Sequence, residues 1–387
     1  MRHNSLAPRP IEHRVKEIFF NIDVWLLLLL LIFAAVGMTT LYSASDGFSS
    51  RFDAQINNWI MAFVLMLVVA QVKPQYLQQM ALPLYILGVI LLIGVDLFGE
   101  TRKGATRWLD VGVAVIQPSE LMKIAMPLML AWWFHQRQRL SNFVNFACSI
   151  IILGIPVALI ILEPDLGTAL LVLAAGVSVI FFAGLSWRIV IPPLVIALLA
   201  ITVVVVKQDE LCQPDVDWVV LHDYQKTRVC TLLDPDKDRL DTGFHIRQST
   251  IAIGSGGLKG KGFLRGTQTH LSFLPERTTD FIFAVYAEEF GLIGNGFLLL
   301  LYFLLIWRGL VISVQAVTAF SRLLACGMTM IFFICAFVNI GMVSGILPVV
   351  GVPLPFMSYG GTALVVFCLA IGVLMSVAGQ TRSQRHD

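Results

Sequence analysis

Charged side chains are scarce in this sequence. Asp, Glu, Lys and Arg make up 13% of its 387 residues, whereas 57% are hydrophobic and the mean hydropathy is +0.81. An ordinary soluble domain carries about 25% charged residues. This composition therefore excludes an ordinary soluble domain and predicts an integral membrane protein. The net charge of +2 gives no argument for a nucleic-acid partner.

Metal-binding and nucleotide-binding motifs are also missing. Neither Cys212 nor Cys230 has a C-x-x-C partner, and His222 stands alone between them, which argues against a metal site there. The glycine cluster at 254–262 matches neither a Walker loop nor a dinucleotide fingerprint, so we expect a flexible loop. Cys212 and Cys230 form a disulfide if their compartment is oxidising, and otherwise stay reduced.

Long apolar runs dominate the rest of the chain. The first is long enough to cross a bilayer, so we expect it to stay uncleaved although Ser43-Ala44-Ser45 behind it resembles a signal-peptidase site. We predict one all-α polytopic membrane domain over 1–387, with about ten transmembrane helices and broken or re-entrant segments. The runs lie near Ile22–Tyr42, Trp59–Val72, Tyr76–Phe98, Gln117–Phe134, Phe143–Leu162, Leu166–Ala183, Ile189–Val206, Phe281–Trp307, Leu323–Val343 and Phe356–Ala378.

Positive residues fall mainly on one side of these helices. With the amino terminus in the cytoplasm, that side receives Lys73, Arg137, Arg139, Arg188, Arg308, Arg322, Arg382 and Arg385. The opposite short loops keep Arg51, Arg102, Lys103 and Arg107. The positive-inside rule expects this asymmetry. We therefore predict that both termini are cytoplasmic and that the polar segment 207–280 is one large extracytoplasmic loop, periplasmic if the cell has an outer membrane.

One apolar stretch, 339–363, cannot form a straight helix. Its prolines remove backbone donors and its glycines disfavour helix: Gly345, Pro348, Gly351, Pro353, Pro355, Gly360 and Gly361. At membrane depth, broken backbone is tolerated only where protein or a water-filled cavity satisfies its polar groups. The stretch therefore lines a cavity, unless it is an ordinary apolar loop at the membrane surface.

Polar residues mark the predicted outer start of the fourth span. In Q-P-S-E-L-M-K at 117–123, Glu120 and Lys123 are three apart and share a helix face. Ionisable groups inside membrane helices are costly and mark functional sites, which makes both residues catalytic candidates. The alternative is an intrahelical ion pair that only neutralises itself.

A second polar group occupies the predicted loop 100–110. Arg102, Lys103 and Arg107 lie near Trp108 in the sequence. A guanidinium suits bidentate contact with phosphate, and a tryptophan stacks on sugars or sits at the membrane interface. This pattern predicts binding of an anionic headgroup, and solvated charges beside an interfacial aromatic are the alternative.

Acidic residues mark two further helix starts. Asp280, close to Arg277, either caps the following helix or accepts a proton from a substrate hydroxyl. Asp165, in E-P-D-L-G-T, either caps the next helix, which we favour, or reaches the cavity. Burial of Glu288 and Glu289 farther along the chain makes an unpaired carboxylate costly and prone to neutralise.

These stretches occur together in one known family. N-x5-G-I-L-P-V-V-G-V-P-L-P-F-M-S-Y-G-G-T-A at 339–363 resembles the signature of the SEDS family, which includes RodA, FtsW and SpoVE. Further motifs resemble the family in order, at 107–110, 117–123, 163–168, 251–262 and 273–285. Those at 222–229 and 266–277 are more similar to RodA than to FtsW, while 207–221 departs from the pattern by extra length.

The resemblance implies a peptidoglycan glycosyltransferase of the inner membrane. Such an enzyme joins lipid II units into glycan strands by β-1,4 bonds and releases undecaprenyl pyrophosphate, for cell-wall elongation and rod shape. It also implies a class B penicillin-binding protein transpeptidase and elongation-complex scaffold proteins as partners, besides membrane lipids. The family's essential aspartate corresponds to Asp280, its membrane glutamate and lysine to Glu120 and Lys123, and its loop aspartate to Asp165.

That reaction needs a base for the acceptor hydroxyl and positive charge for the leaving group. Asp280 is the candidate base, and Glu120 and Lys123 complete the catalytic set. The substrate-binding candidates are Arg102, Lys103, Arg107, Trp108, Arg277 and Ser358. A divalent cation, Mg or Mn, shares the work if Asp280 or Glu120 helps to bind it. The candidates for the cavity wall are Asp165, Pro348, Pro353 and Gly360.

Two other classes of function remain open. A flippase for the same lipid-linked precursor also has broken helices and inward-facing charges, but it needs polar groups along its whole path. Here the polar groups gather toward the outer face. A non-catalytic scaffold would leave Asp280 dispensable for polymer formation.

Overall fold

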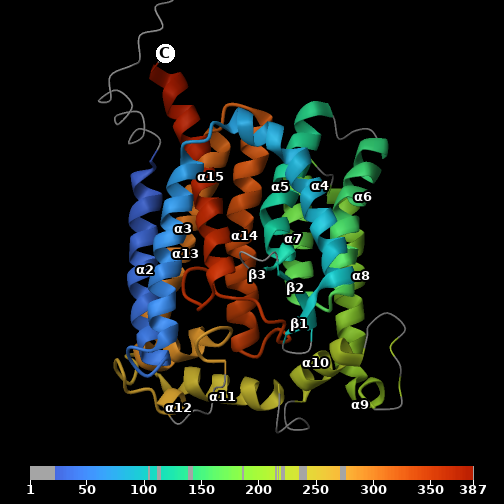
Figure 1. The fold of residues 1–387 in the computed structure, drawn as a ribbon. Coiled ribbons are helices and arrows are strands. Elements are labelled where there is room, and N and C mark those ends of the chain that lie inside the picture. Colours follow the sequence, from blue (N-terminus) through green and yellow to red (C-terminus); the bar gives the residue numbers. More distant parts are fainter. Residues whose placement is uncertain are drawn as a thin grey trace, which may run out of the picture.

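The structure, a computed structural model, describes residues 22–102, 105–110, 115–137, 143–184, 187–213, 216, 218, 223–234, 242–270 and 276–386. Its long helices lie side by side and run between two ends of the molecule (Figure 1). They are α2 (Val24–Ala44), α3 (Ser50–Ala70), α4 (Pro74–Phe98), α5 (Pro118–Arg137), α6 (Phe143–Leu162), α7 (Leu166–Phe182), α8 (Trp187–Val206), α13 (Ile282–Gln315), α14 (Ala319–Val343) and α15 (Gly361–His386). The short helices α9 (Gln208–Leu211), α10 (Asp223–Leu233), α11 (Thr242–Ser255) and α12 (Thr267–His270) lie at one end, here termed the loop end. The opposite end, where α15 finishes, is the terminal end.

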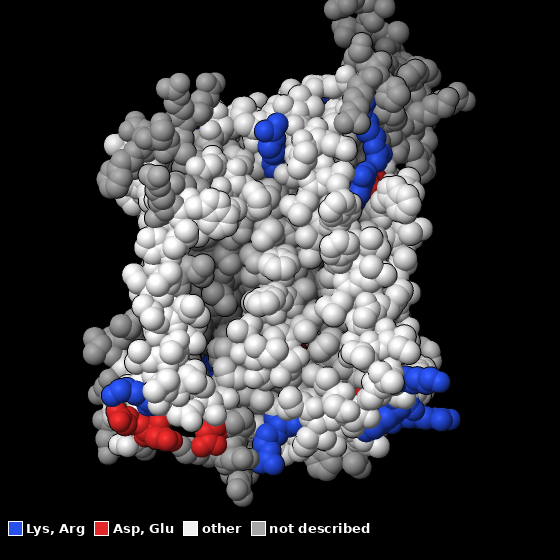
Figure 2. All heavy atoms as spheres, turned by 180° about the vertical axis from the view of Figure 1, so that it is seen from behind, with Lys and Arg blue, Asp and Glu red and all other residues white. Residues whose placement is uncertain are grey.

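Helix length and hydropathy make this bundle a membrane protein. Within the described ranges, eight helices are long and apolar enough to cross a bilayer, and α7 is a shorter apolar helix. Helix α5 is not among the eight, and it carries the charged residues Glu120 and Lys123. On the face in Figure 2, charged side chains gather at the two ends and leave an uncharged band between them. The predicted integral membrane protein is confirmed, whereas the number of about ten spans stays a prediction.

Helices α14 and α15 form the centre of the bundle. In their apolar windows 78% and 72% of the residues are buried inside the protein, against 0% in α8. The ring of Phe356 packs on Phe33, Phe332 and Phe367 with centroids 5.5, 5.5 and 5.8 Å away. Aromatic rings attract one another at such distances. The chain between α14 and α15 is therefore anchored in the core.

Residues 344–360, here termed the broken segment, are not helical. The predicted start of the last helix at Phe356 is wrong, because the prolines delay α15 until Gly361. The segment re-enters the bundle, since the Phe356 carbonyl lies against Gly37, where a Cβ would overlap it. Gly37 precedes the end of α2 at Ala44 by seven residues, or about 10 Å. Phe356 therefore packs within the bundle rather than in a loop at the membrane surface, and the predicted lining of a cavity stays a prediction.

Three antiparallel strands replace the loop expected at 100–110. They are β1 (Glu100–Arg102), β2 (Ala105–Asp110) and β3 (Val115–Ile116), in the order β1-β2-β3. Strands this short leave too little alternation to be recognised from sequence, and they depend on their pairing partners. The sheet lies among the helices, in the half of the bundle nearer the loop end (Figure 1), and carries Arg107 and Trp108 on β2.

The glycine cluster at 254–262 is held in place, so the expectation of a flexible loop is wrong. Helix α13 breaks at Gly291, with φ 63° and ψ −161°, and two amides after the break donate to the carbonyls of Gly257 and Leu258 at 2.9 and 3.1 Å. Two amides of the cluster donate in return to α13 carbonyls, at 3.0 Å each. A Cβ at Gly260 would overlap the α13 backbone. These glycines serve close approach rather than mobility.

A disulfide joins Cys212, just after α9, to Cys230 of α10, with Cα atoms 5.7 Å apart. The ammonium of Lys226 donates to the carbonyls of Gln213 and Val216, at 2.6 Å each. Of the two alternatives for these cysteines, the structure shows the oxidised one. The large loop is thus fastened to itself beside α8.

Candidate active site

Helix α5 follows β3 and has a buried ion pair close to its start. The Nζ atom of Lys123 lies 2.6 Å from Oε1 of Glu120, three residues earlier on the same helix face. Only 1% of Lys123 and 7% of Glu120 are exposed. Such a pair contributes little net stability, because desolvation opposes its attraction. The predicted shared face is confirmed, and the catalytic role of both residues stays a prediction.

Asp165 joins the start of α7 to α5 and β2. One carboxylate oxygen accepts from the Thr168 amide at 3.2 Å, so Asp165 caps α7 as favoured from the sequence. Gln117 Nε2 donates to the other oxygen at 2.9 Å. Arg107 Nη1 lies 3.7 Å from the carboxylate, and Nη2 of the same residue donates to the Pro164 carbonyl at 2.6 Å. Three elements therefore converge on this carboxylate.

Glu163 is a site residue that sequence reasoning did not single out. Its side chain is 3% exposed, and within the described ranges neither carboxyl oxygen has a hydrogen-bond partner. Burial raises its pKa to about 8, with a further rise from Asp165 and Asp96 and a partial offset from Arg107. The carboxyl is therefore mostly protonated at neutral pH. The only feature of the sequence that could have pointed to Glu163 was its place in the charged break between two apolar runs.

Asp280 lies in the turn before α13 and is held by α14 and the broken segment. Phe281 occupies the N-cap position of α13, so the alternative in which Asp280 is the cap residue is wrong. Asn339 donates to the Asp280 carbonyl at 2.9 Å and to the Val352 carbonyl at 2.7 Å. A Cβ at Gly351 would lie 3.5 Å from Oδ2 of Asp280, so this glycine sits beside the carboxylate. Asn339 is the first residue of the family signature at 339–363, but its contact with Asp280 was not predicted.

The broken segment also connects Asp280 with α7. The carbonyl of Val350 lies against Gly167, where any Cβ would overlap it. Gly167 follows Asp165 in the first turn of α7. The neighbouring residues 350 and 351 therefore contact the Asp165 end of α7 and Asp280 respectively. The same segment contains the predicted cavity residues Pro348, Pro353 and Gly360, whose role as a wall stays a prediction.

The Ser358 hydroxyl forms hydrogen bonds that stabilise the fold. Its hydroxyl donates to the Thr279 carbonyl at 2.7 Å and accepts from the Leu354 amide at 2.8 Å. The Tyr359 amide donates to the Thr278 carbonyl at 2.8 Å. These bonds fix the turn that carries Asp280, and the predicted substrate contact of Ser358 stays a prediction.

The structure describes the side chains of two of the other predicted binding residues, Arg277 and Trp108. Arg277 is ion-paired with Asp46, and Trp108 is half-buried in β2. Arg102 belongs to β1, and Lys103 lies outside the described residues. In the part of the chain that the structure describes, no three His, Cys, Asp or Glu side chains gather as metal ligands. The divalent cation expected at Asp280 or Glu120 stays a prediction.

Glu288 and Glu289 are buried in α13, and both have partners. Glu288 Oε1 accepts from Lys261 Nζ at 2.6 Å, from Thr267 Oγ1 at 3.1 Å and from a backbone amide at 3.0 Å. Ser43 of α2 donates to Glu289. Glu288 is thus stabilised as a charged acceptor by its donors, so the condition for the expected neutralisation, an unpaired carboxylate, is not met.

The comparison with known families agrees with these motifs. The family model for FtsW, RodA and SpoVE, described as "Cell cycle protein", matches residues 16–383. The chain belongs to this family. A relative named peptidoglycan glycosyltransferase MrdB, from Escherichia coli (strain K12), is 47% identical over 357 residues, which cover 92% of this chain and 93% of that protein. A family member named peptidoglycan glycosyltransferase RodA, from Treponema pallidum (strain Nichols), is 32% identical over 421 residues, which cover 92% of this chain and 97% of that protein.

Solved structures of the family share the fold. The crystal structure of the rod shape determining protein RodA of Thermus thermophilus has a TM-score of 0.68 at 28% identity, covering 92% of this chain and 96% of that one. A structure described as "Structural coordination of polymerization and crosslinking by a peptidoglycan synthase complex" has a TM-score of 0.76 at 29% identity, covering 94% and 99%. The family fold therefore extends over nearly the whole chain.

Proposed function

We propose that this chain is a peptidoglycan glycosyltransferase that joins lipid II units by β-1,4 bonds and releases undecaprenyl pyrophosphate. One observation carries the proposal: the broken segment contacts both Asp280 and the α7 start where Arg107 meets Asp165. The reaction needs a base and a cation close together. The relatives named peptidoglycan glycosyltransferase support the same activity.

Asp280 is the proposed base. Its carboxylate takes the proton of the acceptor hydroxyl as that oxygen attacks the anomeric carbon of the donor sugar. The bond from that carbon to the pyrophosphate breaks, and its electron pair leaves with the pyrophosphate. Because Asn339 and the broken segment hold this turn, the carboxylate is positioned before substrate arrives.

Among the candidate cations whose side chains the structure describes, Arg107 is the best placed for the leaving pyrophosphate. Its side chain is 30% exposed, against 1% for Lys123 and 15% for Arg277. A guanidinium binds phosphate oxygens in a bidentate manner, which suits this role. Glu120 and Lys123 form a buried ion pair on α5, and we propose that this pair supports the site rather than contacting the pyrophosphate.

The loop end is proposed to face the periplasm, with both termini cytoplasmic and the chain in the inner membrane. Lys73, Arg322 and Arg382 flank helix ends on the terminal side, as the positive-inside rule expects of a cytoplasmic face. The disulfide between Cys212 and Cys230 supports an oxidising compartment for the loop end.

A class B penicillin-binding protein is the proposed partner, together with elongation-complex scaffold proteins. New glycan strands need a crosslinking activity that the residues of this site do not provide. One structurally similar chain comes from a synthase complex that coordinates polymerization and crosslinking. Contact with such a transpeptidase would couple the two reactions.

Polymerisation of purified lipid II by the full chain in liposomes, with its cognate transpeptidase, tests the function. Asp280→Ala is expected to lower the rate by about 100-fold or more while the protein stays folded. Asp209→Ala, at an exposed acid in α9, is the matched control and should leave the rate unchanged. If Asp280→Ala polymerises normally while labelled lipid II crosses the liposome membrane only with protein present, a flippase replaces this proposal.

A further inference from the structure

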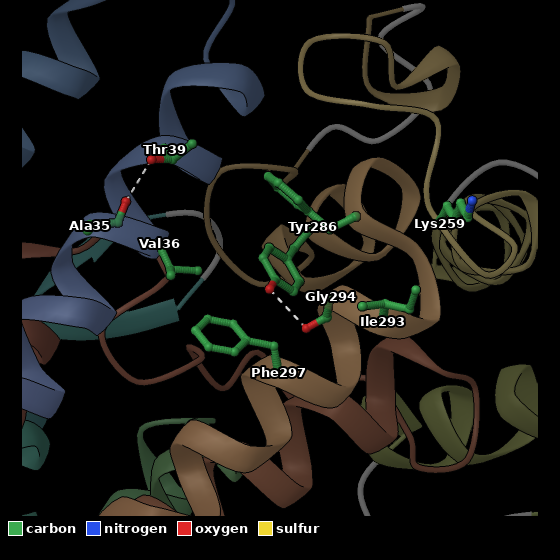
Figure 3. Close-up of a pocket in the computed structure, with 9 residues that line it drawn as sticks. Ala35, Val36, Thr39, Lys259, Tyr286, Ile293, Gly294 and Phe297 are labelled. Carbon is green, nitrogen blue, oxygen red and sulfur yellow. Dashed lines mark hydrogen bonds between the residues drawn. The ribbon is translucent and has the colours of Figure 1, made fainter.

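A cavity of about 680 Å³ opens on the side of the bundle between α2 and α13. Val36 and Thr39 line it from α2, Tyr286 and Phe297 line it from α13, and Lys259 contributes from the glycine cluster (Figure 3). Small-molecule sites typically enclose about 300–1,000 Å³, so the volume suits a bound ligand. None of these residues belongs to the candidate active site.

The break in α13 produces and supports this cavity. Tyr286 and Gly294 stand on the two sides of Gly291, and the Tyr286 hydroxyl donates to the Gly294 carbonyl at 2.9 Å. Gly294 adds no side chain to the lining. Because the glycine cluster satisfies the amides after the break, the hollow does not depend on a ligand to satisfy them.

The lining offers hydrocarbon and one cation. The Thr39 hydroxyl donates a hydrogen bond to the Ala35 carbonyl at 2.7 Å. Both lining hydroxyls, those of Thr39 and Tyr286, therefore donate to nearby backbone carbonyls. Lys261 is held by Glu288 at 2.6 Å. Lys259 is exposed, and no acid of the described ranges forms an ion pair with it. An occupant must therefore be apolar along most of its length and anionic at one end.

Aromatic residues place this cavity in one leaflet of the bilayer. The ring of Tyr42, close to the loop end of α2, packs with those of Phe48, Phe52 and Phe263. Tyrosine is enriched at the level of lipid headgroups, which suits Tyr42. Thr39 lies three residues before Tyr42, about 5 Å deeper along the helix. The cavity thus reaches from the headgroup level into the hydrocarbon of the leaflet at the loop end.

We propose that this cavity binds an anionic phospholipid, with one acyl chain between α2 and α13 and the phosphate at Lys259. The charge of Lys259, the apolar walls and the depth all match one such molecule standing in its own leaflet. This inference does not depend on the proposed enzymatic activity.

Native mass spectrometry of the detergent-purified full chain, with dioleoylphosphatidylglycerol or dioleoylphosphatidylcholine added, tests the proposal. Wild type should retain about fivefold more of the anionic lipid, the factor that one basic residue supplies near an anionic headgroup. Lys259→Gln should abolish that preference. Val36→Trp, which fills the cavity, should lower retention of both lipids.

Lys207→Gln is the matched control, because Lys207 is also an exposed lysine of the loop end but does not line the cavity. It should keep the wild-type preference. The proposal is overturned if Lys259→Gln still prefers the anionic lipid as wild type does. Retention by Val36→Trp equal to that of wild type, with the variant folded, also overturns it.

Discussion

Replacing Glu163 with glutamine tests whether a neutral carboxyl is built into the candidate active site. The glutamate is 3% exposed and faces Asp96 of α4, Arg107 of β2 and Asp165. Glutamine has nearly the same shape and is neutral at every pH. The variant therefore keeps the packing and removes only the titration.

The sign and size of the effect follow from the raised pKa. The ordinary glutamate value is 4.5, and that of Glu163 is about 8. Between these values the folded protein keeps a proton that the unfolded chain releases, so the free energy of unfolding falls as the pH rises. One pKa unit corresponds to about 1.4 kcal/mol, and the loss between about pH 6 and about pH 8 amounts to about 2 kcal/mol. This decrease in the free energy of unfolding is complete above about pH 8 and absent below about pH 4.5.

Thermal unfolding of wild type and Glu163→Gln in detergent, followed across this pH range, measures the difference. The melting temperature of wild type should fall with rising pH more steeply than that of the variant. Glu210→Gln is the matched control, because the Glu210 side chain is 72% exposed and should leave the wild-type slope unchanged. Equal slopes for wild type and Glu163→Gln would refute the reasoning.

Three further predictions concern long-range contacts. Asp23→Asn should lower the free energy of unfolding by about 3 kcal/mol, measured by thermal unfolding, because its fully buried carboxylate pairs with two arginines of α13 and α15. Gly260→Ala should cost about 2 kcal/mol or more in the same assay, since φ is 78° there and a Cβ would overlap the Glu289 carbonyl. Asn339→Ala should slow lipid II polymerisation by about tenfold to 100-fold in folded protein, because it removes a hydrogen bond that holds Asp280. Unchanged melting for the first two, or an unchanged rate for the third, would contradict them.

Local chemistry was enough to predict several features. Apolar runs located the long helices to within a few residues at many ends, since crossing a bilayer requires a minimum apolar length. The cap at Asp165 and the shared face of Glu120 and Lys123 depend on residues only three apart. The prolines of 344–360 excluded a continuous helix there.

Other features depend on partners that are distant in the sequence. The expectation of a mobile glycine cluster failed because its glycines pack on the break at Gly291, which nothing local reveals. The hydrogen bonds of Asn339 could not be predicted, since its two acceptors belong to other segments of the chain.

The sequence by itself therefore determined the membrane class, the approximate helices and the motifs that place the chain in its family, because these follow from composition and short-range order. Only the tertiary structure decided that the broken segment contacts both Asp280 and the Asp165 end of α7. It also decided that Glu163 is buried without a hydrogen-bond partner among the described residues. Burial and desolvation are set by every element packed around a group, so no local pattern can specify them.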